Sequence, residues 1–414
     1  MKILFYTSYP TQESGYSRIG NIITNYLSEK NNEVHYYGIN NNLNTFIERY
    51  IDKNIILIDG EEEENKLETK ELYCINSLCN YIEIIAPDIL FLYNEITVIS
   101  QVLKIFNEKN MNINFKIFTY LDLIFPYEKI NLITEVDNYS NIIFVYSEYW
   151  KENLIKMGIK EEKIEILQPG FDDKSFFEID KIDAKKYFKF KEDDFIILNS
   201  CKNNCIKGID KTIDAFVKFI KLKNKNNIKL FLYMNLMNIK NQGYNIEDYF
   251  RISCLKYDAN YIDLINNNVF VKENNLYSDQ KLNFLYNACD IGINTSIGEG
   301  FGICNLEHAG LGKPQIVSNI GGLKDIFKKE NSIPIVPVSE IYVSSNIYFP
   351  GGYAKICSTD DFVSAIDKYY ENADIILEHG TKCKKMILEK FNWKKILEKL
   401  NNIINDEFYL NKKL

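Results

Sequence analysis

The chain contains 414 residues, more than one hydrophobic core usually organises, and we expect two domains. Its formal net charge of −8 argues against nucleic acid as a partner, because a phosphate backbone requires a basic face. The nine cysteines have neither an even number nor the spacing of a zinc knuckle or a thioredoxin-like motif. We therefore expect reduced thiols and a cytoplasmic protein.

The first half of the chain alternates short apolar runs with helical patterns. The run at residues 2–6 is too short for a secretion signal and is interpreted as a first strand. Strands that are almost continuously apolar indicate a parallel sheet covered by helices on both faces. No apolar run approaches the roughly 20 residues of a membrane span, so any membrane contact would be peripheral. Further strands are expected at residues 33–38, 54–58, 88–93, 115–121 and 141–147.

The second half repeats this pattern and predicts a second α/β unit. Two open parallel sheets in one chain predict a ligand site in a cleft between them, at the carboxyl ends of the strands. Residues 386–408 carry apolar residues at helical spacing and predict one or two closing helices. The strands of this unit are expected at residues 195–200, 229–234, 268–272, 289–296 and 314–319.

Two acidic segments have simple interpretations. The run EEEEN at residues 61–65 is interpreted as a solvated loop. The run EDD at residues 192–194 is interpreted as surface acids, so no metal ligands are expected there.

The segment IGEGFGICNLEHAGLGKPQ, residues 297–315, follows a predicted strand and combines a glycine-rich loop with a helix expected from about Gly302 onward. The start of such a helix presents N–H groups and the positive end of the helix dipole, which favour an anion such as phosphate. Glycines there permit a close approach of the ligand to the backbone.

Two glutamates accompany this loop. Glu299 precedes the helix, whereas Glu307 lies about five residues inside it, roughly 7 Å further along. They suit a long ligand with hydroxyl groups at both ends and an anion between them, as in a nucleotide sugar. The spacing alone equally permits a turn with a capping acid at Glu299 and a surface acid at Glu307, since a lone glycine pattern is weak evidence.

The segment SIGEGFGICNLEHAGLGKPQIVSNIGGLKDI closely resembles the E-x7-E region of the retaining enzymes of glycosyltransferase family 4, which have the GT-B fold. The resemblance implies an α/β fold of two Rossmann-like domains whose parallel sheets face each other across a cleft. It covers most of the chain and is carried by residues 7–27, 144–159, 163–176, 285–296 and 296–326.

The resemblance also implies a division of the chain. An N-terminal Rossmann-like, acceptor-side domain is expected at residues 1–180. A C-terminal Rossmann-like domain that binds the nucleotide sugar is expected at residues 190–385. Helices at residues 386–414 are expected to pack back on the N-terminal domain.

Roles for the motif residues follow from the same resemblance. Glu307 would hold the ribose hydroxyls of the donor, and Glu299 would lie beside the transferred sugar. Lys202 and Lys207 occupy the positions of the family's usual Arg and Lys. Lys202 departs from that pattern, because a point charge replaces a bidentate guanidinium fork. Backbone groups of Gly300, Phe301 and Gly302 would approach the donor sugar and diphosphate.

In the first domain, none of the chain's three histidines falls where many relatives place one near the sugar. The matching segment offers Tyr120 and Asp122, and Asp122 is a candidate acceptor-side group, with a turn cap as the alternative. Gly15 and Arg18 would approach the diphosphate from this domain. His308 is interpreted as a packing residue of the motif helix.

The resemblance implies a retaining hexosyltransferase with a UDP- or GDP-sugar donor and a sugar, glycan, glycoconjugate or lipid-linked acceptor. No metal and no cofactor other than the donor substrate is expected. The alternative is a GT-B protein that binds nucleotide or glycan without catalysis. Lys202 in place of Arg and the absent histidine favour this alternative, whereas the intact motif and Lys207 favour the enzyme. A glycoside hydrolase is disfavoured, because hydrolases seldom need a phosphate cradle.

Overall fold

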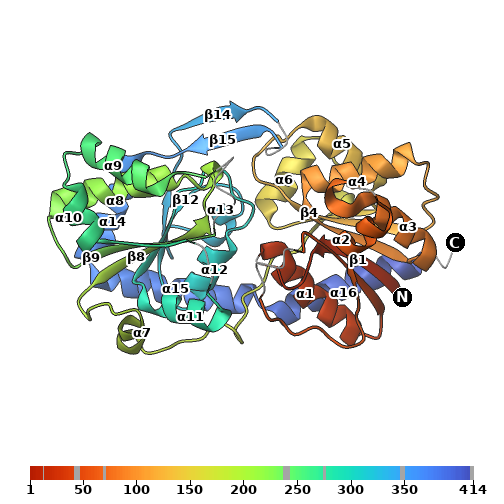
Figure 1. The fold of residues 1–414 in the computed structure, drawn as a ribbon, viewed down its shortest axis with the longest axis horizontal. Coiled ribbons are helices and arrows are strands. Elements are labelled where there is room, and N and C mark those ends of the chain that lie inside the picture. Colours follow the sequence, from red (N-terminus) through yellow and green to blue (C-terminus); the bar gives the residue numbers. More distant parts are fainter. Residues whose placement is uncertain are drawn as a thin grey trace. The chain divides into compact units, whose positions relative to one another are not determined.

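The computed structural model describes residues 1–12, 14–41, 47–68, 71–235, 243–273, 277–345 and 350–410. Its contacts divide the chain into two compact units. The first unit comprises Met1–Pro169, Val343–Gly352 and Trp393–Leu414. The second unit comprises Gly170–Tyr342 and Tyr353–Asn392. Each unit is built around one parallel sheet, which confirms the predicted α/β class with two Rossmann-like domains (Figure 1).

The sheet of the first unit has the strand order β3-β2-β1-β4-β5-β6-β7, with every neighbouring pair parallel. Its strands are β1 (Lys2–Ser8), β2 (Glu33–Ile39), β3 (Ile56–Asp59), β4 (Ile89–Glu95), β5 (Lys116–Asp122), β6 (Ile142–Val145) and β7 (Ile164–Ile166). Its helices are α1 (Gly15–Glu29), α2 (Gly60–Lys66), α3 (Ile75–Ile85), α4 (Ile96–Glu108), α5 (Ile130–Tyr139), α6 (Glu148–Lys156) and α16 (Trp393–Leu410), with short 3-10 turns η1 (Leu72–Cys74) and η2 (Glu161–Lys163).

The sheet of the second unit has the equivalent order β10-β9-β8-β11-β12-β13, again parallel throughout. Its strands are β8 (Phe195–Lys202), β9 (Ile228–Asn235), β10 (Val269–Glu273), β11 (Ile291–Asn294), β12 (Gln315–Ser318) and β13 (Ile333–Ile335). Its helices are α7 (Lys181–Tyr187), α8 (Ile209–Lys223), α9 (Ile246–Lys256), α10 (Tyr261–Asn267), α11 (Asp279–Ala288), α12 (Ile303–Gly310), α13 (Leu323–Ile326), α14 (Thr359–Glu371) and α15 (Ala373–Lys390), with the 3-10 turn η3 (Cys205–Lys207). A separate two-stranded sheet is formed by β14 (Ser339–Val343) and β15 (Gly352–Ile356).

The order of the strands fixes where loops meet. In the second unit the chain runs outward from β8 to β10, then crosses to the other side of β8 and continues as β11. The loops after β8 and β11 therefore leave adjacent strands in opposite directions, which is the switch point where ligands bind in open α/β sheets. Right-handed crossovers place α8, α9 and α10 on one face of this sheet and α11 and α12 on the other (Figure 1).

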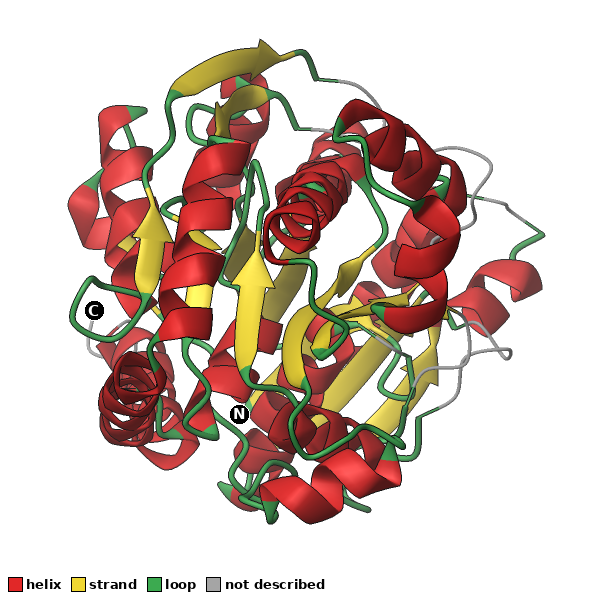
Figure 2. Cartoon of the chain, turned by 90° about the vertical axis from the view of Figure 1, so that its left-hand side faces the viewer, coloured by secondary structure: helices red, strands yellow, loops and turns green. Residues whose placement is uncertain are grey.

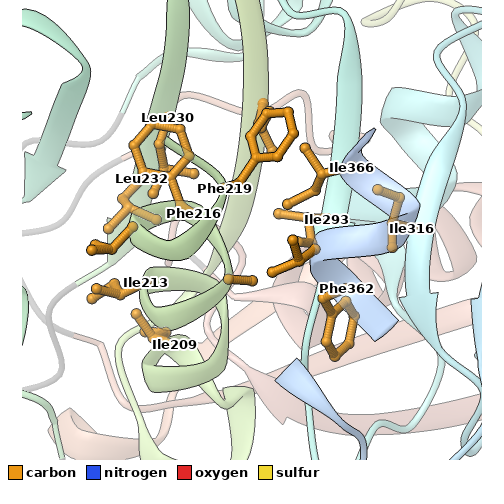
Figure 3. Close-up of a cluster of buried hydrophobic side chains, with 14 of the residues drawn as sticks. Ile209, Ile213, Phe216, Phe219, Leu230, Leu232, Ile293, Ile316, Phe362 and Ile366 are labelled. Carbon is orange, nitrogen blue, oxygen red and sulfur yellow. The ribbon is translucent and has the colours of Figure 1, made fainter. Parts of the chain in front are cut away.

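Helices cover the strands of the second unit on both faces, as shown in Figure 2, where the left-hand side of Figure 1 faces the reader. Helix α8 supplies much of the packing, because its apolar residues recur at helical spacing and lie against β9 (Figure 3). The apolar core includes Ile209, Ile213, Phe216 and Phe219 of α8, Leu230 and Leu232 of β9, and Phe362 and Ile366 of α14.

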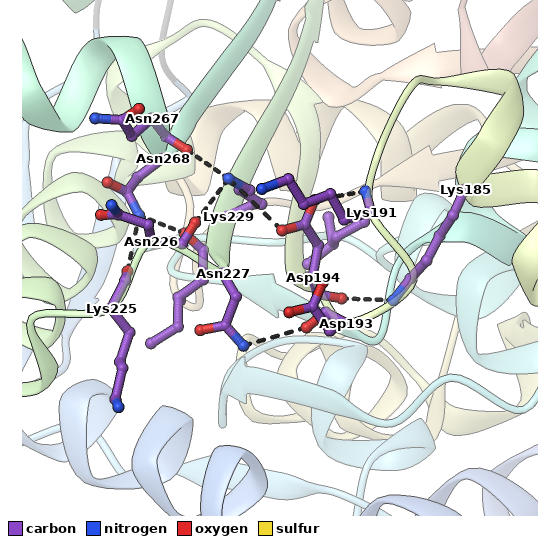
Figure 4. A network of polar contacts seen from close by, with 12 residues as sticks. Lys185, Lys191, Asp193, Asp194, Lys225, Asn226, Asn227, Lys229, Asn267 and Asn268 are labelled. Carbon is purple, nitrogen blue, oxygen red and sulfur yellow. Dashed lines mark hydrogen bonds and ion pairs between the residues drawn. The ribbon is translucent and has the colours of Figure 1, made fainter.

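A polar network closes the amino-terminal edge of the same sheet (Figure 4). Asp194 is buried, its Oδ2 accepts a hydrogen bond from the Lys191 N–H at 2.9 Å, and its Oδ1 lies 3.6 Å from Lys229 Nζ. The interpretation of residues 192–194 as surface acids is therefore wrong for Asp194. Asn268 donates to the carbonyls of Lys225 and Ile228 at 3.1 and 2.7 Å. These groups fasten strand ends together, far from the loops at the carboxyl edge.

The expectation of a solvated loop at residues 61–65 is also wrong, because this segment forms most of α2. Asp59 caps the helix by accepting hydrogen bonds from its first N–H groups, and glutamates in a first turn favour the helix dipole. Glu64 is buried and accepts from the N–H and hydroxyl of Ser77 at 2.9 and 2.6 Å.

Candidate functional site

The glycine-rich loop lies between β11 and α12, as the sequence predicts, and two glycines determine its shape. Gly302 precedes the helix with φ +88°, a left-handed conformation, and a Cβ there would lie 2.4 Å from Leu323 Cδ2. Gly322 donates from its N–H to the carbonyl of Gly300 at 3.1 Å, and a Cβ on it would lie 2.4 Å from that oxygen. The loop is thus held in one conformation against the turn after β12.

Lys207 and Glu299 meet at the switch point of the second unit. Lys207 Nζ lies 2.7 Å from Oε1 and 2.8 Å from Oε2 of Glu299, so the ammonium group spans both carboxylate oxygens. Both side chains are largely buried, with 21% and 9% of their surface exposed. The pair is separated by 92 positions in sequence and is brought together because the loops after β8 and β11 are neighbours.

The two loops are locked to each other by close backbone contacts. Gly208, directly after Lys207, has φ +57°, and a Cβ there would lie 2.2 Å from the carbonyl oxygen of Thr295. Thr295 Oγ1 donates to the carbonyl of Gly208 at 2.7 Å, and the N–H of Ile297 donates to Ile206 at 2.8 Å. These contacts fix the backbone of Lys207 next to the motif loop, so its side chain starts beside Glu299.

Lys202 is the last residue of β8 and pairs in register with Asn235 of β9. Its side chain is half-buried at the same carboxyl edge of the sheet. Phe301 is buried, and its ring packs edge-on against Phe391 with centroids 5.8 Å apart. This ring anchors the loop, while the predicted approach of the Gly300, Phe301 and Gly302 backbone to a donor stays a prediction.

Glu307 occupies a different environment from Glu299. It is the fifth residue of α12, is buried, and accepts a hydrogen bond from the hydroxyl of Tyr286 at 3.0 Å. The neighbouring His308 is buried and stacks on Tyr286, with centroids 5.4 Å apart. Burial lowers the pKa of His308 to about 3, so its ring is neutral. These contacts agree with a packing role for His308.

The remaining candidates, Gly15, Arg18 and Asp122, belong to the first unit. Gly15 begins α1, which follows β1, and Asp122 ends β5. The hydroxyl of Tyr16 donates to Asp122 Oδ2 at 2.6 Å, and Glu95 of β4 lies beside Asp122 in register. Tyr120 is fully buried, and its hydroxyl donates to the carbonyl of Leu167, so it belongs to the core.

A carboxyl group that the sequence did not single out lies close to Asp122. Glu128 is 2% exposed, and its Oε1 accepts hydrogen bonds from the N–H groups of Ile124 and Phe125 at 2.7 and 3.2 Å. Burial raises the pKa of Glu128 to about 8, and the charges of Asp122 and Glu95 act in the same direction. Glu128 thus keeps its proton near neutral pH.

We expect Glu128→Gln to stabilise the protein at pH 8 but not near pH 4.5. The pKa is raised in the folded chain, so above pH 4.5 the unfolded chain releases a proton that the folded chain retains, and stability falls until the pH passes about 8. The gain at pH 8 is on the order of a few kcal/mol. Melting temperatures at both pH values test this, with the exposed Glu108→Gln as a control. Equal gains at the two pH values would contradict the raised pKa.

Comparisons with known proteins identify a similar family and similar folds. Residues 180–340 match the family model of glycosyl transferases group 1. A sucrose-phosphate synthase from Thermosynechococcus elongatus has a similar structure, with a TM-score of 0.74 and 14% identity over 99% of this chain and 100% of that chain. The HepE protein of Anabaena, in complex with UDP-glucose, gives a TM-score of 0.68 and 13% identity over 98% and 100% of the two chains. These likenesses show the predicted GT-B fold.

One curated relative is an uncharacterized glycosyltransferase of Methanocaldococcus jannaschii, 24% identical over 271 residues. The match covers 63% of this chain and 59% of that relative's length. Within the part of the chain that the structure describes, no helix has the length and apolar character needed to cross a lipid bilayer.

The sequence did not point to Asn294, Asn305 and Gln315, which connect Glu299 to His308 through buried hydrogen bonds. Two features of the sequence could have indicated them: an amide, Asn294, at the end of a buried strand, and another, Asn305, on the buried side of the motif helix. In a chain rich in asparagine that signal does not stand out.

Proposed function

We propose that this chain is a retaining hexosyltransferase of glycosyltransferase family 4, which transfers a hexose-type sugar from a UDP- or GDP-sugar to a sugar or glycoconjugate acceptor. The observation that carries the proposal is the buried ion pair between Lys207, in the loop after β8, and Glu299, in the glycine-bounded loop before α12. It combines a cation, a carboxylate and a helix start at one switch point, which are the groups that a sugar diphosphate requires.

Charge on the leaving diphosphate is the main demand of the reaction. The start of α12 contributes the positive end of its dipole, and Lys207 contributes a full charge whose place is fixed by its bonds to Glu299. Lys202 adds a second cation at the same edge. Groups held in place before the reaction stabilise developing charge without reorganisation, and this electrostatic effect is usually the largest in catalysis.

The two motif glutamates take the ends of the donor. Glu307 accepts hydrogen bonds from the ribose hydroxyls, with Tyr286 holding its other side. Glu299 accepts from a hydroxyl of the transferred hexose. A carboxylate accepts several hydrogen bonds at once, so each can keep its protein partner and bind the sugar.

We propose that the acceptor attacks on the face from which the diphosphate departs. The bond between the anomeric carbon and the phosphate oxygen breaks, the acceptor oxygen bonds to that carbon, and the departing phosphate oxygen takes the acceptor's proton. This scheme requires neither a strong protein base nor a metal. Asp122, which the Tyr16 hydroxyl holds in place, is proposed to orient a hydroxyl of the acceptor, a glycan or lipid-linked sugar.

The test combines binding and turnover. The melting temperature is measured with UDP, GDP, ADP and TDP, because a ligand that binds the folded chain raises it. Release of the best-binding diphosphate from its sugar conjugates is then followed with and without EDTA. We expect one diphosphate to stabilise the chain and its sugar conjugate to be turned over in both conditions. The complex of HepE with UDP-glucose supports UDP as the first choice.

Binding without release would favour the non-catalytic alternative, which Lys202 in the usual place of Arg already supports. If no nucleoside diphosphate raises the melting temperature, the proposed function is wrong. Turnover that EDTA abolishes would contradict metal independence alone.

A further inference from the structure

A chain of buried amides starts at Glu299. Glu299 Oε2 accepts hydrogen bonds from Asn294 Nδ2 at 3.2 Å and from Ser296 Oγ at 3.1 Å. Asn294 Nδ2 also donates to Asn305 Oδ1 at 2.8 Å. Asn294 ends β11 and Asn305 lies on α12, so this chain ties the strand, the loop and the helix together at the carboxylate.

The chain continues away from the site. Asn305 Nδ2 donates to Gln315 Oε1 at 2.9 Å. Gln315 Nε2 donates to the carbonyl of Lys313 at 2.9 Å and lies 3.1 Å from His308 Nδ1. Gly292 faces Gln315 across the β11–β12 pair, and a Cβ on it would lie 2.0 Å from Gln315 Oε1. A glycine at this point of β11 leaves the room that the amide needs.

The direction of every amide in the chain is determined from both ends. Asn294 Oδ1 accepts a hydrogen bond from the N–H of Ser296 at 2.9 Å, so Asn294 presents its NH2 group to Glu299, and its second N–H reaches Asn305 Oδ1. Asn305 in turn presents its NH2 group to Gln315 Oε1. At the far end the Lys313 carbonyl also only accepts, which fixes the Gln315 NH2 group there. One arrangement satisfies all of these groups.

We infer that Asn305 is a positioning residue for the first motif carboxylate: through Asn294 it holds Glu299 in the orientation that the sugar requires. The inference rests on the proposed function. Lys207 holds the same carboxylate from the loop after β8, and a phosphate anion competes for the lysine's charge. The amide chain is neutral, so a diphosphate does not draw it away from Glu299, and hydrogen bonds in a connected buried chain strengthen one another.

The alternative is that Asn305 is only a satisfied polar group of the core. A core role affects stability, whereas a positioning role affects turnover through Asn294. Asn268 is a matched control, since it is 2% exposed and donates two amide hydrogen bonds, but lies at the amino-terminal edge of the sheet (Figure 4).

The test measures kcat, the donor KM and the melting temperature for Asn305→Ala, Asn294→Ala, their double variant and Asn268→Ala. Asn305→Leu repeats the test without a cavity and serves if Asn305→Ala does not fold. We expect Asn305→Ala and Asn305→Leu to lower kcat about tenfold with the donor KM changed less than about twofold. The double variant should have the kcat of Asn294→Ala, because the two residues act in series. Asn268→Ala should lower the melting temperature but not kcat.

Three results would overturn the inference alone while the wild-type chain turns over its donor. The first is an unchanged kcat in the Asn305 variants. The second is a double variant whose loss of kcat is the product of the losses in Asn294→Ala and Asn305→Ala. The third is a loss of kcat in Asn268→Ala as large as that in Asn305→Ala. A wild-type chain that releases no nucleotide from any donor overturns the proposed function, and the inference falls with it.

Discussion

Lys207→Ala is expected to reduce sugar transfer by about 10²–10³-fold, the loss found when one preorganised group that stabilises developing charge is removed. The lysine makes a bidentate contact with Glu299 of the loop before α12, at 2.7 and 2.8 Å from the two carboxylate oxygens. Its removal also leaves that buried carboxylate without its counterion, which disturbs the sugar subsite. The rate of nucleotide release at saturating donor measures the effect.

Lys211→Ala is the matched control for this variant. Lys211 lies one turn further along the same segment and pairs with Asp210 at 3.6 Å, with 30% of its side chain exposed. An ion pair that is partly open to solvent, with its charged atoms 3.6 Å apart, contributes little, so its loss should leave transfer within about twofold of wild type. A mild effect of Lys207→Ala, comparable to that of Lys211→Ala, would show that Lys207 has no role at the phosphate.

The two motif glutamates should separate in their kinetics. Glu307→Ala should weaken binding of the nucleoside diphosphate by about 10–100-fold, because hydrogen bonds to charged groups contribute about 1.5–3 kcal/mol, and should change kcat less. Glu299→Ala should instead lower kcat by a comparable factor and leave diphosphate binding nearly unchanged. Calorimetric binding and steady-state rates distinguish the two.

Asp214→Asn is a control for loss of a buried carboxylate. Asp214 is 1% exposed and bonds Ser253 and Lys256 on α9 at 2.8 and 2.6 Å, away from the motif loop. It should lower stability without either kinetic effect. If Glu299→Ala and Glu307→Ala both transfer sugar at the normal rate, the assignment of the site is wrong.

The fold class follows from the sequence because the central strands are nearly all apolar, as strands covered on both faces must be. The short strands at the edges of the sheets are harder to predict, because they contain too few residues to show an apolar run. The strands β7 and β13 have three residues each, and β13 contains Pro334. Proline cannot donate to a sheet and is tolerated only where a strand lies at an edge, as β13 does.

The prediction for residues 61–65 failed for a different reason. The prediction rested on the run of four glutamates, which is typical of a solvated loop. It gave too little weight to two local signals that favour a helix, namely Asp59 as a cap and glutamates in the first turn. The burial of Glu64 depends on its partner Ser77, thirteen positions away, and no local pattern reveals such a contact.

Some residues of the candidate site could be predicted from the sequence, and others only from the structure. The glycine loop and its two glutamates form a contiguous segment, so the sequence reveals them, and the resemblance adds Lys207. The contact of Lys207 with Glu299 depends on strand order, which the sequence does not display. The amide chain through Asn305 depends on side chains from two strands and one helix, and only the packed structure brings these together.

The central claim is that the start of α12 and Lys207 form the seat of a nucleoside diphosphate. It is tested most directly by calorimetric titration of wild type and Lys207→Ala with the diphosphate that stabilises the chain most and with the corresponding nucleoside. The account predicts that wild type binds the diphosphate at least about tenfold more tightly than the nucleoside, and that Lys207→Ala narrows this gap. Equal affinity of wild type for the two ligands, or a gap that Lys207→Ala leaves intact, would contradict it.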